Sequence, residues 1–150
     1  MTVYDIAAEL PSIDVLRDRC RALAVLECVV DGGEPYYAYA RDWGADEAAS
    51  MDNGSGDEWT VVFTADGAFI RVFDPDGSGL LEILLDDIAE RYVAFAEDHY
   101  DDVELDRTAV ERIVAQLPLT DPVVRALNPA VTLAGLHEAV TAIGYPVAAS

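Results

Sequence analysis

The chain has 150 residues, of which 52% are hydrophobic, so length and composition predict one domain with its own core. Twenty-nine Asp and Glu residues stand against nine bases, all of them arginine, which gives a formal net charge of −20. A field of that sign repels nucleic acids, anionic lipids and phosphate-rich ligands, and it attracts basic proteins. We therefore expect neither a direct nucleic-acid partner nor membrane attachment.

The start of the chain and the cysteines favour a cytoplasmic protein. Residues 1–10 carry two acids and no base, unlike a secretory signal, and no apolar run is long enough to span a membrane. Cys20 and Cys28 fall on one predicted helix, about 12 Å apart at 1.5 Å per residue. A disulfide needs Cα atoms within about 7 Å, so we expect two free thiols.

Two helices are predicted before residue 32. The first covers residues 1–10 and ends before Pro11. Ser12 is a good N-cap for the second, which ends at Gly32-Gly33. Its apolar stripe recurs at three- and four-residue steps: Ile13, Leu16, Cys20, Leu23, Leu26 and Val30. Three arginines, Arg17, Arg19 and Arg21, surround this helix and are expected to pair with neighbouring acids such as Asp14 and Asp18.

The middle of the chain predicts a three-stranded antiparallel meander over residues 36–74. Strands are expected at residues 36–43, 59–65 and 68–74, with a tight turn at Asp66-Gly67 between the last two. Residues 44–57 form a polar, glycine-containing loop in this interpretation. Val61, Phe63 and either Phe69 or Ile70 are expected to face a layer of helices.

Helices are predicted again after the meander. A long one carries Leu81, Leu84, Leu85, Ile88, Tyr92 and Phe95 on one face. Others run from Asp106 or Thr108 to Leu117, from Thr120 to Leu127 with Pro122 in the first turn, and from Thr132 to Gly144. The chain is thus predicted to be a single α+β domain over residues 1–150, with N-terminal helices, the meander and C-terminal helices.

The first half of the chain resembles a group of actinobacterial, Streptomyces-type proteins. The resemblance rests on Asn-Gly-Ser-Gly-Asp-Glu-Trp at residues 53–59, on Arg71 to Asp74, and on Tyr4-Asp5-Ile6 and Leu10-Pro11-Ser12 near the start. After Asp74 the similarity fades. It implies a bacterial, cytoplasmic origin and brings no activity with it.

Motifs for metals, phosphates and catalysis are incomplete. Residues 74–85 resemble an EF-hand calcium loop, but Leu85 stands where the bidentate Glu is needed. The glycine-rich residues 53–58 lack the Lys-Ser/Thr ending of a phosphate loop. We expect no cofactor, no metal and no catalytic set. The alternative is a metal-binding or hydrolytic domain in which His99 acts with Asp98, Asp101 or Asp102.

The acidic stretch from Asp86 to Asp106 holds nine acids and one base, Arg91. Glu82, Asp86 and Glu90 stack at four-residue steps, where like charges repel and no base is placed to relieve them. We expect these carboxylates to face solvent as one patch that recognises a basic protein: Asp86, Asp87, Glu90, Glu97, Asp98, Asp101, Asp102 and Glu104.

These features predict a small acidic binding protein, a monomer or weak dimer, that inhibits or neutralises a basic partner. Immunity proteins, antitoxins and nuclease inhibitors, including nucleic-acid mimics, have this size and charge. A secondary candidate site is the 44–58 loop with its aromatic flanks: Trp43, Asn53, Asp57, Glu58 and Trp59. A further alternative is an acidic housekeeping scaffold whose charge reflects its host alone.

Overall fold

The computed structural model describes residues 12–30, 36–43, 46–52, 58–73, 88–99 and 105–148, and every structural statement below concerns these. In chain order they form helix α2 (Ile13–Val30), four strands and four further helices. The fold is α+β, as predicted. The predicted first helix, over residues 1–10, lies outside the described residues.

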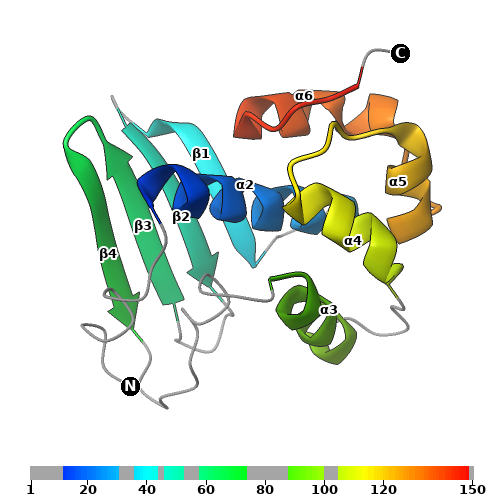
Figure 1. The fold of residues 1–150 in the computed structure, drawn as a ribbon, viewed down its shortest axis with the longest axis horizontal. Helices are drawn as coiled ribbons and strands as arrows, with labels where there is room; N and C mark the ends of the chain where they lie inside the picture. The colour runs from blue at the N-terminus through cyan, green and yellow to red at the C-terminus, as the bar shows by residue number, and fades with distance from the viewer. Residues whose placement is uncertain are drawn as a thin grey trace.

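The sheet is antiparallel with strand order β1-β2-β3-β4, so each strand pairs with its neighbour in sequence. The strands are β1 (Tyr37–Trp43), β2 (Asp46–Asp52), β3 (Glu58–Thr64) and β4 (Gly67–Phe73). The predicted turn between β3 and β4 is confirmed, and Gly67 there has a φ of 153°. The sheet crosses the left side of Figure 1.

The three-strand prediction is wrong, because β2 lies where a polar loop was expected. Its sequence, Asp-Glu-Ala-Ala-Ser-Met-Asp, is poor in the β-branched and aromatic residues that favour strands. The segment is nevertheless hydrogen-bonded on both sides, to β1 and to β3. Ala49 and Met51 alternate into the core, so tertiary pairing overrides the weak local preference.

The inner face of the sheet packs on α2. In register, one row across the strands is Tyr39, Ala49, Val61 and Ile70, and the next is Tyr37, Met51, Trp59 and Val72. Val61 and Phe63 are buried and Ile70 packs against the core, whereas Phe69 is 72% exposed. The prediction that Val61 and Phe63 face inward is therefore confirmed. Of the two candidates on β4, Ile70 faces inward and Phe69 faces outward.

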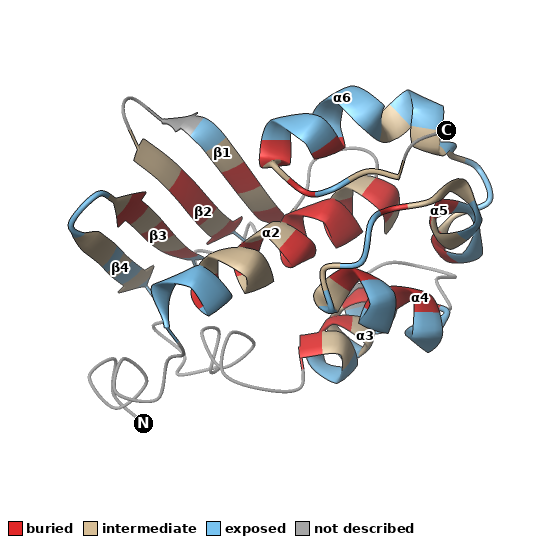
Figure 2. Cartoon of the chain, turned by 45° about the horizontal axis from the view of Figure 1, so that its top comes forward, coloured by how far each residue is buried: buried red, intermediate tan, exposed pale blue. Residues whose placement is uncertain are grey.

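Helix α2 lies between the sheet and the other helices (Figure 1). Its first turn is exposed, but beyond Leu16 it is buried on most sides, as Figure 2 shows. The predicted stripe accounts for only part of this burial, because Ala22, Ala24, Val25 and Val29 are buried as well. The helix thus contributes to the core on two sides. Cys20 is buried, Cys28 is half-buried, and both are free thiols as predicted.

The remaining helices gather on the other side of α2. They are α3 (Ile88–His99), α4 (Arg107–Val114), α5 (Asp121–Leu127) and α6 (Leu133–Ile143). Asp106, Thr120 and Thr132 are the N-caps of the last three, and each side chain accepts a hydrogen bond from a backbone N–H in the first turn. Within the described ranges, no helix is both long and apolar enough to cross a membrane.

Candidate functional site

Helix α3 contains the described part of the predicted acidic patch. Ile88, Tyr92 and Ala96 are buried on one side of this helix. Glu90, Glu97 and Asp98, here called the α3 carboxylates, are exposed. The apolar side of α3 therefore fixes these acids toward solvent. The other members of the predicted patch, Asp86, Asp87, Asp101, Asp102 and Glu104, lie outside the described residues.

The expectation that no base relieves the row Glu82, Asp86 and Glu90 is wrong at Glu90. Arg107 of α4 lies 3.9 Å from the Glu90 carboxylate and 3.1 Å from that of Glu111. All three side chains are more than half exposed, so each pair contributes little, within about 1 kcal/mol. Sequence spacing could not reveal this contact, because it joins two helices. The electrostatic potential around Glu90 is therefore less negative than a row of unpaired carboxylates would give.

The secondary candidate loop is only partly visible. Trp59 is 1% exposed in the core, so it cannot serve as an aromatic anchor at the surface. The strand alternation of β3 explains this, because Trp59 shares its inward parity with Val61 and Phe63. Glu58 is exposed at the start of β3. Asn53, Asp57 and the Trp43 side chain lie outside the described residues.

The outer face of the sheet is a surface that the sequence reasoning missed. Its rows follow from the register: Ala40, Ala48, Val62 and Phe69; then Ala38, Ser50, Thr60 and Arg71; then Asp52, Glu58 and Phe73. Phe69 and Phe73 are 72% and 54% exposed. The described helices contact the opposite face (Figure 1). The alternating residues of β4 could have predicted this surface, but the sequence does not show which set, Phe69, Arg71 and Phe73 or Ala68, Ile70 and Val72, faces inward.

Glu27 is a fully buried carboxylate in the C-terminal half of α2. One oxygen accepts hydrogen bonds from the backbone N–H groups of Tyr36 at 2.8 Å and Tyr37 at 3.3 Å. The other accepts a hydrogen bond from the Tyr92 hydroxyl at 2.8 Å. Glu27 thereby joins α2, the start of β1 and α3. Burial, followed by the nearby charge of Glu27, raises the pKa of Cys28 and of the Tyr37 hydroxyl.

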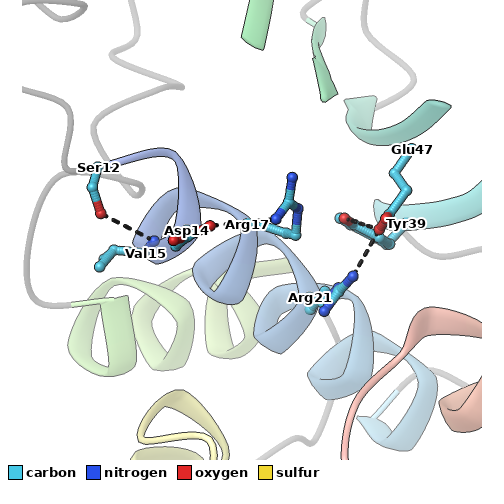
Figure 3. Close-up of polar contacts among 7 residues, drawn as sticks. All are labelled: Ser12, Asp14, Val15, Arg17, Arg21, Tyr39 and Glu47. Carbon is cyan, nitrogen blue, oxygen red and sulfur yellow. Dashed lines mark hydrogen bonds and ion pairs between the residues drawn. The ribbon is translucent and has the colours of Figure 1, made fainter. Parts of the chain in front are cut away.

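A second polar cluster lies between the N-terminal half of α2 and the sheet (Figure 3). The Glu47 carboxylate accepts hydrogen bonds from Arg21 at 2.7 Å and from the Tyr39 hydroxyl at 2.6 Å. The Arg21 guanidinium also lies 5.2 Å from the centre of the Tyr39 ring. Arg17 pairs with Asp14 at 3.5 Å, as the sequence predicted, whereas Arg21 pairs with β2. The Nε atoms of Arg17 and Arg21 are buried with no hydrogen-bond partner among the described residues, but the bonds from Arg21 and Tyr39 to Glu47 still join α2 to the sheet.

The cluster gives a pH-dependent prediction for Glu47. Burial alone would raise the pKa of Glu47, but hydrogen bonds from Tyr39 and Arg21, with the nearby positive charges, outweigh it and lower the pKa. A lowered pKa stabilises the folded state above the unfolded-state value of about 4.3, and this contribution disappears as the pH falls through the folded-state value. We expect Glu47→Gln to lower the free energy of unfolding by about 1–2 kcal/mol at pH 7.

Urea unfolding at pH 7 and pH 3 measures this difference. The gap between wild type and Glu47→Gln should shrink at pH 3, because that pH lies below the unfolded-state pKa of about 4.3 and the contribution of the charge is lost as the pH falls toward the lowered folded-state pKa. Glu58→Gln is the matched control, since Glu58 is exposed. A gap of equal size at both pH values would show that shape, and not charge, decides the effect.

Within the described ranges, no group of three or more His, Cys, Asp or Glu residues could hold a metal ion. The His99 side chain, Asp101, Asp102 and the calcium-loop-like residues 74–85 lie outside those ranges, so the metal alternative stays a prediction. Comparisons with protein-family models, curated proteins and solved structures give no match.

Proposed function

We propose that this protein binds a basic protein in the cytoplasm, as a monomer or weak dimer, and inhibits or neutralises it. An immunity protein, an antitoxin or a nuclease inhibitor would act in this way. The observation that carries the proposal is the set of α3 carboxylates, turned to solvent by a buried apolar side on a chain of net charge −20.

The position of α3 suits recognition. Tyr92 lies on its buried side and donates its hydroxyl hydrogen bond to Glu27, so the helix is held against α2. The carboxylates are presented on a helix already in place, and binding therefore orders little backbone. Attraction between opposite charges can raise association rates to about 10⁸–10⁹ M⁻¹s⁻¹ at low salt. Such rates suit an inhibitor that must reach its target before the target acts.

A partner that normally binds nucleic acid fits this surface best. Exposed carboxylates at several positions along one helix present separated negative charges, much as a nucleic-acid backbone presents phosphates. The arginines and lysines that hold phosphates can pair with carboxylates in the same bidentate manner. A nucleic-acid-binding partner would then be blocked by competition for its own site, and excess nucleic acid should displace the protein from it.

Neutralising the α3 carboxylates tests the proposal. In Glu90→Gln/Glu97→Gln/Asp98→Asn, we expect association with the partner to slow about tenfold at low salt, because local steering is lost. The dissociation rate should change less, and the salt dependence of the association rate should become shallower. The partner is first captured at low salt on immobilised wild-type protein, and the kinetics are then measured by surface plasmon resonance.

A second triple variant serves as the control. Asp14→Asn/Asp66→Asn/Glu138→Gln removes the same charge from exposed positions on other elements. It should slow association much less. Equal slowing in both variants would show that only the net charge acts. An association rate that is unchanged by both sets of substitutions and by salt would favour the acidic-scaffold alternative. Circular dichroism checks that each variant folds.

A further inference from the structure

We infer that the outer face of strands β3 and β4 docks a segment of the partner that carries both basic and apolar side chains. This inference rests on the proposed function and adds a second contact surface to it. The surface, here called the outer sheet face, comprises Glu58, Val62, Phe69, Arg71 and Phe73 with Asp52 of the adjoining strand.

The apolar part of this surface is continuous. Val62 stands directly opposite Phe69 in register, so the two form an apolar pair across β3 and β4. Ala48, opposite Val62 on β2, is buried, so the accessible apolar surface ends at β3. Phe69 and Phe73 share one face of β4, roughly 13 Å apart at 3.3 Å per residue. They are 72% and 54% exposed in the folded chain. Phenylalanine buries a large area on contact, and exposed rings so placed are typical anchors of an interface.

The charged residues of the outer sheet face indicate which kind of partner segment binds there. Glu58 lies opposite both Asp52 and Phe73 in register, so carboxylates and an aromatic ring share one end of the face. Asp52 and Glu58 are both exposed, so this end of the face presents negative charge to solvent and would attract a cation from a partner. An arginine or lysine docked there would place its neighbouring apolar side chains toward Phe69 and Val62. The face therefore matches a segment in which basic and apolar residues alternate.

A second copy of the chain fits this surface poorly. It would bring the same carboxylates and a further net charge of −20 to the contact. The carboxylates of Asp52 and Glu58 would add like charge from both copies, and Arg71 is the one base in the neighbouring row of the face. Charge complementarity thus selects a cationic partner.

The probe for the test is a short synthetic peptide that alternates arginine with isoleucine. Two matched peptides replace every arginine with glutamate or every isoleucine with serine. Each is titrated into the whole protein while backbone amide resonances are followed by NMR. We expect saturable binding of the arginine–isoleucine peptide alone, with shifts centred on Glu58, Val62, Phe69 and Phe73. Phe69→Ser/Phe73→Ser should weaken this binding at least tenfold, about the effect of losing one strong anchor.

Two control variants keep the result interpretable. Leu117→Ser removes another exposed apolar side chain, from the α4–α5 connection, and should leave the affinity unchanged. The triple substitution of the α3 carboxylates separates this inference from the proposed function. Loss of binding in the triple variant, with shifts confined to α3, would overturn the outer sheet face and leave the proposed function standing.

Other outcomes also decide the matter. Equal binding of the serine peptide would show that charge alone acts, and this would overturn the inference. The absence of saturable binding by any peptide would do the same. Sedimentation that shows a dimer lost in Phe69→Ser/Phe73→Ser would make a second copy the occupant. A further outcome is that peptide binding persists at high salt and in the α3 triple variant but disappears in Phe69→Ser/Phe73→Ser. That result would support docking on the outer sheet face and contradict electrostatic steering by the α3 carboxylates.

Discussion

Glu27→Ala is expected to lower the free energy of unfolding by about 3–5 kcal/mol, because it leaves several buried donors without their acceptor. The backbone N–H groups of Tyr36 and Tyr37 and the hydroxyl of Tyr92 all donate to this carboxylate. Each buried donor left unsatisfied costs about 1–3 kcal/mol, and the missing side chain adds a cavity. A loss of that size approaches the whole stability of a typical domain, about 5–15 kcal/mol.

Glu27→Gln and Tyr92→Phe make the measurement decisive even if the alanine variant does not fold. The glutamine carbonyl can still accept from the two backbone N–H groups, and its NH2 can donate to the Tyr92 oxygen, which also accepts. Tyr92→Phe removes one hydrogen bond and leaves part of Glu27 unsatisfied. We expect both to cost less than alanine by urea unfolding with an unchanged m-value. Three variants as stable as the wild type would show that Glu27 stabilises nothing.

Trp59→Ala should be comparably destabilising, by about 3–5 kcal/mol, for a different reason. Trp59 is 1% exposed and lies in register between Met51 and Val72, with the Tyr37 ring centroid 6.1 Å away. Truncation opens a cavity in a region where four aromatic and apolar side chains meet. The surrounding sheet is hydrogen-bonded along β2 and β4, so it cannot collapse far to fill the space.

Trp59→Phe separates volume from polarity at the same position. The indole N–H of Trp59 is buried and has no hydrogen-bond partner among the described residues, and burying such a group unpaired opposes folding by about 1–3 kcal/mol. Phenylalanine removes that group while keeping much of the ring, so the two effects offset each other. We expect a net loss below about 1.5 kcal/mol by thermal and urea unfolding. Phe69→Ala, at an exposed position, is the control and should change stability by less than about 0.5 kcal/mol.

Local patterns sufficed for the elements that are stabilised locally. The caps Thr120 and Thr132, the turn at Asp66-Gly67 and the periodicity of α2 all predicted structure that the fold contains. Strand β2 was not predicted because it is stabilised by hydrogen bonds to β1 and β3 and not by its own sequence. Ala49 and Met51 are too few, among acids and small residues, to reveal an apolar alternation.

The functional surfaces were predictable only in part. The exposure of Glu90 follows from the apolar periodicity of α3, but its contact with Arg107 depends on how two helices cross. Glu27 is the one acid in residues 22–30, the apolar half of α2, but this pattern did not identify it as a structural site. Nothing nearby in the sequence identified Tyr92, 65 residues away, as its partner. Long-range pairing of this kind is set by the tertiary fold alone.

The burial of α2 on most of its sides bears on how the chain gains and loses its structure. A helix with a solvent-facing stripe can survive the detachment of one neighbour, whereas α2 would expose Val25 or Leu26 whichever layer left it. A partly folded state in which only the sheet or only the other helices cover α2 is therefore expected to be unstable. Folding should be all-or-none, without a populated intermediate. The amides of α2 beyond its exposed first turn should exchange with solvent deuterium only when the entire molecule opens.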